Sequence, residues 1–185
     1  MLLFEKVIFN SEECKDIIRS IIQWEEAGLY VKKNNTEYTI LQKPKLRKSF
    51  RSDIVVRKGG PTFDNLKLAL NEVGFDITSD TLEGSVLKYG KGDFLYKHDD
   101  LTDHNNTRIA CCVTQLSDLT DYNGGELICY NGDEKIIVNK SIGNTVIFRP
   151  EVPHETLIIE SGERYSLVIW AKAEDVKSIR KNQLI

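Results

Sequence analysis

Apolar residues in the C-terminal half of the chain occur in short runs, and residues that favour turns separate these runs. From about Thr81 onward, Asn123-Gly124-Gly125, Asn131-Gly132-Asp133 and Gly143-Asn144 mark the turns. Short runs between such turns are typical of β-strands. We predict eight strands, over residues 84–90, 93–98, 108–116, 126–130, 135–138, 145–149, 155–160 and 164–171. Together with a helical start, they indicate a mostly β protein of the α+β class, with a double-stranded β-helix (jelly-roll) core braced by helices.

The N-terminal part of the chain has a different pattern. Met1–Phe9 predicts a strand. Ser11 is the expected N-cap of a helix, since Glu12 and Glu13 would lie at the positive end of the helix dipole. One face of this helix is apolar, through Cys14, Ile17, Ile18, Ile21 and Ile22. We expect the helix to end near Gly28 and to cover a sheet.

A second helix is predicted over Asp64–Val73, with Leu66, Leu70 and Val73 on one face and Gly74 at its end. No internal repeat or linker interrupts the chain. We therefore expect one domain over residues 1–185, in which residues 1–80 supply helical support and residues 81–172 form the jelly-roll core.

Positive charge is concentrated between residues 30 and 60. The cations are Lys32, Lys33, Lys43, Lys45, Arg47, Lys48, Arg51, Arg57 and Lys58, against only Glu37 and Asp53. Residues 37–42 and 52–57 look like strands joined by a polar loop. The segment 43–58 has two interpretations: an ordinary solvated loop, or a mobile flap that meets an anionic or peptide substrate.

The composition limits the remaining choices. The chain has 185 residues, of which 41% are hydrophobic and 29% charged, and its formal net charge is −3, which gives no general attraction to nucleic acid or to an anionic membrane. The first residues carry charges and are too few for a signal peptide, and no apolar run approaches the roughly 20 residues of a membrane span. We expect a cytoplasmic protein without nucleic-acid or membrane partners.

The four cysteines are Cys14, Cys111, Cys112 and Cys129. None forms a C-x-x-C pair, so a cysteine zinc site is not expected. Cys111 and Cys112 are neighbours that face opposite sides of a strand. We predict that all four are reduced, buried small side chains.

Candidate metal ligands centre on His98-Asp99-Asp100. On a strand, residues i and i+2 point to the same face, so His98 and Asp100 can converge while Asp99 points away. The other histidines are His104, in a polar stretch that indicates a solvated loop, and His154, between a turn and an apolar run. Two histidines and one carboxylate with open coordination positions are typical of non-haem Fe(II) oxygenases.

Several motifs occur in a fixed order around these residues. They are Tyr89-x-x-Gly92-Asp-Phe-Leu95, His98-x-Asp100, Arg108, Leu116-Ser-Asp118, Tyr122-Asn-Gly-Gly-Glu-Leu127, Gly143-Asn-x-x-Ile-Phe148, His154-Glu155 and Gly162-x-Arg164-Tyr-Ser-Leu-x-x-Trp170. Over roughly residues 84 to 172, the chain resembles the 2-oxoglutarate- and Fe(II)-dependent dioxygenases, and the prolyl-4-hydroxylase-like branch most of all.

The resemblance implies roles for specific residues. His98, Asp100 and His154 would bind Fe(II). Arg164, ten residues after His154, would bind the distal carboxylate of 2-oxoglutarate, with Tyr89 and Ser166 as further contacts. No catalytic residue beyond the metal ligands is expected.

Four further residues are candidates for contact with the substrate. Arg108 and Trp170 match positions near the substrate in relatives, although surface exposure for Arg108 and a core position for Trp170 are alternatives. Arg47 and Arg51 belong to a stretch that resembles the Arg- and Ser-bearing segment before the core of prolyl hydroxylases.

The resemblance implies that 2-oxoglutarate and O2 are cosubstrates, with ascorbate as a candidate reductant. The expected reaction converts 2-oxoglutarate to succinate and CO2 and hydroxylates an unactivated C–H bond. The first substrate expected is a prolyl residue in a peptide or protein, and the alternative is a free amino acid or small metabolite. From another class, a non-catalytic cupin-like metal or ligand binder would keep the histidines but have no use for Arg164 and Tyr89. A zinc hydrolase is disfavoured because no general base accompanies a third neutral ligand.

Overall fold

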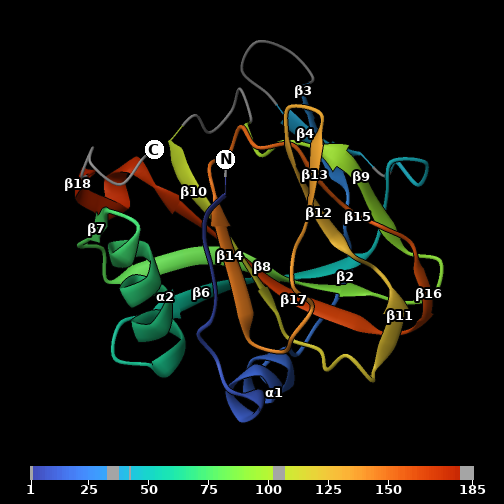
Figure 1. Cartoon of the computed structure of the whole chain (residues 1–185), viewed down its shortest axis with the longest axis horizontal. Helices are drawn as coiled ribbons and strands as arrows, with labels where there is room; N and C mark the ends of the chain where they lie inside the picture. Colours follow the sequence, from blue (N-terminus) through green and yellow to red (C-terminus); the bar gives the residue numbers. More distant parts are fainter. Residues whose placement is uncertain (1, 33–37, 42, 102–106, 180–185) are drawn as a thin grey trace.

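Two antiparallel sheets face each other, and two helices cover the outer side of the larger one (Figure 1). The computed structural model describes residues 2–32, 38–41, 43–101 and 107–179. The larger sheet has the strand order β1 (Leu2–Val7), β14 (Asn144–Phe148), β10 (Arg108–Gln115), β17 (Arg164–Lys172), β8 (Thr81–Tyr89), β6 (Phe50–Arg57) and β2 (Glu25–Glu26). This arrangement confirms the mostly β, jelly-roll prediction.

The smaller sheet carries the histidine-bearing strands. Its order is β13 (Glu134–Ile137), β12 (Leu127–Asn131), β15 (His154–Thr156), β9 (Phe94–His98) and β5 (Arg47–Lys48). Three two-stranded pairs complete the described structure: β11 (Tyr122–Gly124) with β16 (Ile159–Gly162), β7 (Phe75–Ile77) with β18 (Val176–Ile179), and β3 (Leu29–Lys32) with β4 (Tyr38–Leu41). A 3-10 turn, η1 (Ala173–Asp175), precedes β18.

Alternation along β10 separates two buried clusters. Cys111 and Val113 pack between the sheets with residues such as Phe148, whereas Ala110 and Cys112 pack toward the helices. All four cysteines are free and buried, as predicted. The space between the sheets is therefore lined by one face of each strand, and the site forms there.

Helix α1 (Ser11–Arg19) is shorter than predicted and begins one residue earlier. Its N-cap is Asn10 rather than Ser11, because the Asn10 side chain accepts hydrogen bonds from the backbone N–H groups of Glu12 and Glu13 while the Glu13 side chain accepts one from Asn10. The helix ends at Arg19, not near Gly28. Ile22, which the apolar pattern placed on the helix face, is 99% exposed.

Helix α2 (Pro61–Glu72) also begins earlier than the predicted Asp64, since proline at its first position has a backbone angle suited to a helix start. The predicted strand 155–160 is two strands, β15 and β16, interrupted at Leu157 and Ile158. The short strands β2, β3, β5, β7, β11 and β18 were not predicted individually.

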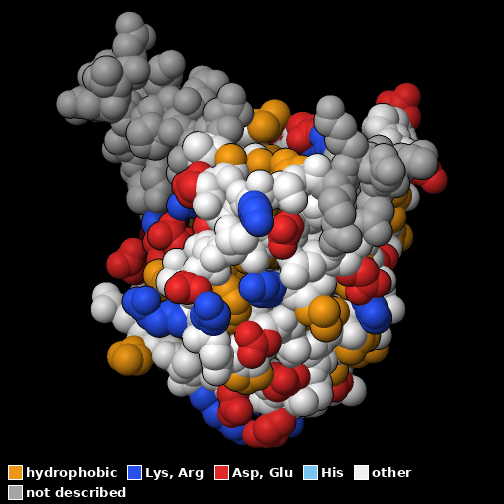
Figure 2. Space-filling model, turned by 90° about the vertical axis from the view of Figure 1, so that its left-hand side faces the viewer, with side chains coloured by type: hydrophobic (Ala, Val, Ile, Leu, Met, Phe, Trp, Pro, Cys, Tyr) orange, Lys and Arg blue, Asp and Glu red, His pale blue; other side chains and the backbone are white. Residues whose placement is uncertain are grey.

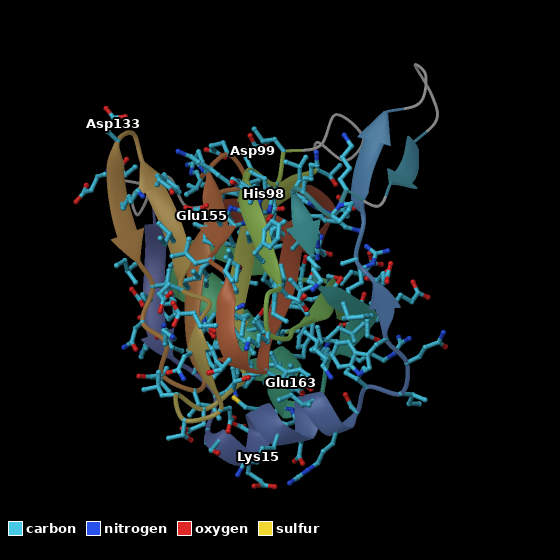
Figure 3. All side chains as sticks on the ribbon, turned by 90° about the vertical axis from the view of Figure 1, so that its right-hand side faces the viewer. Lys15, His98, Asp99, Asp133, Glu155 and Glu163 are labelled. Carbon is cyan, nitrogen blue, oxygen red and sulfur yellow. The ribbon has the colours of Figure 1, made fainter. Side chains whose placement is uncertain are left out.

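The surface shows no segregation of charge on the face drawn in Figure 2, where Lys and Arg side chains are interspersed with Asp and Glu. Among the described residues, no helix combines the length and apolar character needed to cross a membrane. His98 and Asp99 lie at the end of the molecule opposite to Lys15 of α1 (Figure 3), so α1 supports the sheets away from the candidate site.

Candidate functional site

The two histidines of the candidate metal site are direct partners in adjacent strands. His154 on β15 pairs with His98 on β9, and the centroids of their imidazole rings are 4.3 Å apart. β9 ends at His98, and the backbone N–H of Asp100 then donates to the carbonyl of Pro150 over 2.8 Å. This hydrogen bond holds the segment after β9 against the loop before β15, and it places Asp100 beside the imidazole rings of His98 and His154.

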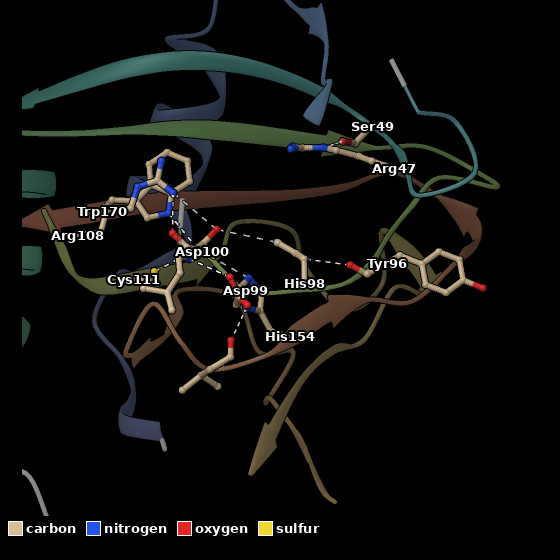
Figure 4. A network of polar contacts seen from close by, with 12 residues as sticks. Arg47, Ser49, Tyr96, His98, Asp99, Asp100, Arg108, Cys111, His154 and Trp170 are labelled. Carbon is tan, nitrogen blue, oxygen red and sulfur yellow. Dashed lines mark hydrogen bonds and ion pairs between the residues drawn. The ribbon is translucent and has the colours of Figure 1, made fainter. Parts of the chain in front are cut away.

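One potential ligand atom from each of His98, Asp100 and His154 lies within 4.8 Å of the others. The Asp100 carboxylate has Oδ1 4.0 Å from His98 Nε2 and Oδ2 3.9 Å from His154 Nε2 (Figure 4). Two imidazole nitrogens and a carboxylate at such separations fit a single Fe(II) ion that would take one bond from each side chain.

Backbone carbonyls orient both rings in the same way. The Nδ1 atoms of His98 and His154 lie 2.9 Å from the carbonyl oxygens of Tyr96 and Val152, two residues earlier in each case. If each Nδ1–H donates to its carbonyl, the lone pair of each Nε2 faces Asp100. The strand geometry therefore selects the tautomer that can bind a metal.

The electrostatic environment favours the ligand forms of these groups. Burial, reinforced by the neighbouring His154, lowers the pKa of His98 to about 4, so its imidazole is neutral near pH 7. Burial alone would raise the pKa of Asp100, but His154, His98 and the donors Trp170 and Cys111 outweigh it, and the pKa lies below its ordinary value. A neutral imidazole and an ionised carboxylate are the forms that bind a metal.

Asp99 takes no part in this cluster. Its side chain is exposed, and its Oδ1 accepts a hydrogen bond from the backbone N–H of Leu101 over 3.1 Å. It thus points away from Asp100, as strand alternation predicts, and its partner is the adjoining turn. His104, the other histidine considered as a ligand, lies outside the described residues.

Arg164 is a buried cation in the cavity that the metal cluster borders. Its residue is 1% exposed, and it pairs directly with Tyr89 across β17 and β8, its guanidinium carbon 5.5 Å from the Tyr89 ring centroid. Its Nε and Nη2 have no hydrogen-bond partner among the described residues. Because leaving buried guanidinium nitrogens unpaired is costly, the arrangement fits a ligand carboxylate.

The cavity has a volume of about 70 Å³. Its polar lining includes His98, Asp100, His154, Arg164 and Ser166, and Tyr89 also lines it. The apolar walls are Leu87, Leu95, Val113, Leu127 and Val168. One end thus offers metal ligands and the other a buried cation with a hydroxyl beside it.

Gly125 makes room for Arg164. Its φ is +64°, and a Cβ atom added there would lie 2.2 Å from Cδ1 of Ile159 and 3.2 Å from Cδ of Arg164. The glycine pair that was predicted to mark a turn thus lets the loop before β12 lie against the Arg164 side chain.

Comparison with known proteins agrees with this geometry. Residues 84–172 match the family model described as the 2OG-Fe(II) oxygenase superfamily. These residues belong to that superfamily. A comparison with curated protein sequences finds no match.

Solved structures of prolyl hydroxylases share the fold of this protein. A Pseudomonas putida prolyl-4-hydroxylase is 21% identical, with 91% of each chain covered and a TM-score of 0.61. A viral collagen prolyl hydroxylase from Paramecium Bursaria Chlorella virus-1 is 18% identical, with 90% of this chain and 93% of that chain covered and a TM-score of 0.60. A Trichoplax adhaerens prolyl hydroxylase, in complex with a hypoxia inducible factor peptide fragment, is 15% identical over 88% of this chain and 76% of that chain, with a TM-score of 0.57.

Arg108 and Trp170, expected near the substrate of the oxygenase, both contact Asp100. Trp170 Nε1 donates to Asp100 Oδ2 over 3.0 Å, and Arg108 Nη1 donates to the Asp100 carbonyl oxygen over 3.3 Å. The Arg108 guanidinium carbon lies 4.1 Å from the Trp170 ring centroid. Trp170 lines the cavity, and both residues line an adjoining groove of about 270 Å³.

Cys111 is the residue of this site that sequence reasoning missed. Its Sγ donates to Asp100 Oδ2 over 3.1 Å, and burial, followed by the charge of Asp100, raises the pKa of its thiol well above the ordinary value. No local signal distinguishes it from the other buried cysteines. The register of β10 against β17 decides which cysteine reaches the site.

Arg47 and Arg51 line the same cavity as the metal cluster. Arg47 donates through Nε to Ser49 Oγ over 3.0 Å, and Arg51 Nη2 lies 3.6 Å from Asp53 Oδ2. Burial lowers the pKa of Arg47, and the neighbouring positive charge of Arg51 adds to this. Two cations therefore border one side of the cavity.

Much of the basic segment 43–58 is sheet rather than loop. Arg47 and Lys48 of β5 pair with Leu95 and Phe94 of β9, and β6 pairs with β8 from Phe50 to Arg57. The strand expected over residues 52–57 is part of β6, and for Arg47, Lys48 and Phe50 the solvated loop is wrong, because their backbones pair within the two sheets; a flap that becomes ordered with substrate stays a prediction. The contact of Arg47 and Arg51 with the substrate stays a prediction.

Proposed function

We propose that this protein is an Fe(II)- and 2-oxoglutarate-dependent hydroxylase of an unactivated C–H bond. The observation that carries the proposal is the buried Arg164, whose Nε and Nη2 have no hydrogen-bond partner within the described part of the chain, in the cavity that His98, Asp100 and His154 border. If the protein were a cupin-like binder that does not bind 2-oxoglutarate, these two nitrogens would have no ligand to pair with. Bound Fe(II) would supply the activation of O2 that couples decarboxylation of 2-oxoglutarate to hydroxylation.

The chain's own residues bind and orient the reactants. His98, Asp100 and His154 would hold the metal through one face, leaving the cavity side open. Arg164 would bind the distal carboxylate of 2-oxoglutarate by charge-assisted hydrogen bonds, with Ser166 and Tyr89 beside it. The apolar walls exclude water from the reacting groups, which strengthens these polar contacts.

The substrate we propose is a prolyl residue in a peptide segment that also carries an acidic group. Arg47 and Arg51 support the acidic group, because both cations border the cavity and an anionic group of the substrate would be attracted to them. The fold shared with prolyl hydroxylases, one of them in complex with a peptide fragment, makes a prolyl residue the first choice to test.

A free amino acid is the second candidate substrate. The groove beside the cavity is lined by the carboxylates of Asp53 and Glu83 and by the cations Arg51, Arg108 and Lys172. Side chains of both signs could bind the ammonium and carboxylate groups of one small molecule.

Synthetic peptides test the substrate directly. Three peptides with one proline, flanked by Glu, Ser or Lys, and free proline are incubated with the protein, Fe(II), 2-oxoglutarate, ascorbate and air. We expect mass spectrometry to find one oxygen atom added to the proline of the Glu-flanked peptide at the highest rate. Oxygen added only to free proline would favour the second candidate, and equal rates for all three peptides would refute the role given to the two arginines.

A further inference from the structure

The carboxylate of Asp100 is held asymmetrically. Its Oδ2 accepts two hydrogen bonds, from Trp170 Nε1 over 3.0 Å and from Cys111 Sγ over 3.1 Å (Figure 4). The neighbours of Oδ1 are farther away, with Arg108 Nη1 at 3.8 Å and the imidazole Nε2 of His98 at 4.0 Å. The two oxygens of one side chain thus have different surroundings.

Sheet register brings the two donors to the same oxygen. Cys111 on β10 and Trp170 on β17 are direct cross-strand partners, so their side chains point to the same face of the larger sheet. Asp100 reaches that face from the end of β9 in the smaller sheet. The contact therefore crosses the space between the sheets and depends on their packing.

A carboxylate oxygen has two lone pairs, and two donors can occupy both. We propose that Trp170 and Cys111 are positioning residues that hold Oδ2 toward the protein and leave Oδ1 as the atom that binds the metal. This inference rests on the proposed function, because it assumes that Asp100 is a metal ligand. It assigns to Cys111 a role that neither its burial nor its strand position requires.

Arg108 also holds Asp100 in place, but through contacts other than Oδ2. Its guanidinium stacks on the Trp170 ring and donates to the Asp100 carbonyl oxygen. It thereby restrains both the donor ring and the backbone of the acceptor. Groups that orient a ligand in this way commonly change metal affinity by about 10- to 100-fold when removed.

The chain contains a matched control for Cys111. Cys112 is the next residue, is equally buried at 0% exposure, and packs on the opposite face of β10 among residues of the helix-side cluster. Replacing either cysteine with alanine removes a buried thiol of the same size. Only the Cys111 variant removes a donor to Asp100.

The test is calorimetric titration of the metal-free protein with Fe(II) under anaerobic conditions, without 2-oxoglutarate. We expect Trp170→Phe and Cys111→Ala each to weaken Fe(II) binding by about 10- to 100-fold. Cys111→Ser should restore affinity to within a few-fold of wild type, because its hydroxyl can still donate, and Cys112→Ala should bind as wild type does. Thermal unfolding of the metal-free variants separates loss of positioning from loss of fold.

The outcomes distinguish this inference from the proposed function. If the wild-type protein does not bind Fe(II), the proposed function fails and the inference fails with it. If the wild type binds but Trp170→Phe and Cys111→Ala keep its affinity, the inference alone is overturned. If Cys111→Ala does not fold, Trp170→Phe decides the question, since it keeps an aromatic ring on β17 while removing the N–H donor together with part of the indole, and thermal unfolding measures what the smaller ring costs in stability.

Discussion

His98 and His154 are direct partners in the antiparallel pairing of β9 and β15, and each ring has its Nδ1 beside the carbonyl of the residue two positions earlier. This repeated geometry points both Nε2 atoms at Asp100. The site is therefore organised by backbone pairing, so the ligands are oriented before a metal binds.

Replacing either histidine should abolish tight Fe(II) binding. His98→Ala or His154→Ala removes one of three protein ligands, while the sheets around them retain their apolar contacts. Anaerobic titration with Fe(II) is the measurement, with far-ultraviolet circular dichroism as the test of fold. His104→Ala is the control and should bind as the wild type does; loss of binding in that variant instead would show that the ligand assignment is wrong.

Replacing Arg164 with alanine should weaken the binding of 2-oxoglutarate far more than the binding of Fe(II). Losing a charge-assisted contact costs roughly 1.5–3 kcal/mol, which is about 10- to 150-fold in affinity. The KM for 2-oxoglutarate measures the effect. Arg149→Ala is the control, because Arg149 is only partly buried, does not line the cavity, and has its Nη1 3.7 Å from Glu151 Oε1. If the two variants have the same KM, Arg164 does not bind the cosubstrate.

Arg47→Ser should separate the two halves of the reaction. The side chain borders the cavity from β5 of the smaller sheet, whereas Arg164 lies on β17 of the larger sheet, so 2-oxoglutarate turnover without substrate should persist while hydroxylation of an acidic peptide falls by several-fold. Succinate and hydroxylated peptide are measured together. Lys45→Ser, at an exposed position nearby, should change neither product. Equal loss of both products in Arg47→Ser would indicate structural support rather than substrate contact.

Local patterns predicted the strands well because each depends on neighbouring residues. The turn at Asn131-Gly132 joins β12 to β13, and the glycine has a φ of +62°, which L side chains rarely adopt. The order of motifs similarly predicted which side chains would meet, and the structure brings His98, Asp100, His154, Arg164, Tyr89 and Ser166 to one cavity.

The errors arise where a contact that the spacing of apolar residues does not contain decides the outcome. Isoleucine spacing extended the first helix past Arg19, but Ser20 ends it by donating through its hydroxyl to the Ile17 carbonyl, and Glu25 and Glu26 then pair with β6. The link between Cys111 and Asp100 was also missed, since it depends on how two sheets pack. Periodicity within one segment contains neither piece of information.

Gly143 should be much less tolerant of substitution than Gly132. Both have positive φ, +76° and +62°, but a Cβ atom at Gly143 would lie 1.9 Å from the Phe9 carbonyl oxygen, whereas nothing lies within 4 Å at Gly132. Gly132→Ala should cost about 1 kcal/mol of unfolding free energy from backbone strain, and Gly143→Ala at least about 2 kcal/mol. Urea denaturation measures both; equal costs would contradict the close approach of Gly143 to the backbone of Phe9.

The central claim is that one cavity binds Fe(II) at the His98–Asp100–His154 end and 2-oxoglutarate at Arg164. The most direct measurement is succinate formed from 2-oxoglutarate under air with Fe(II) and ascorbate, compared among the wild type, His154→Ala and Arg164→Ala. We expect succinate from the wild type, none above background from His154→Ala, and recovery of Arg164→Ala only at raised 2-oxoglutarate concentration. Wild-type-like succinate formation by His154→Ala, or none by the wild-type protein loaded with Fe(II), would contradict it.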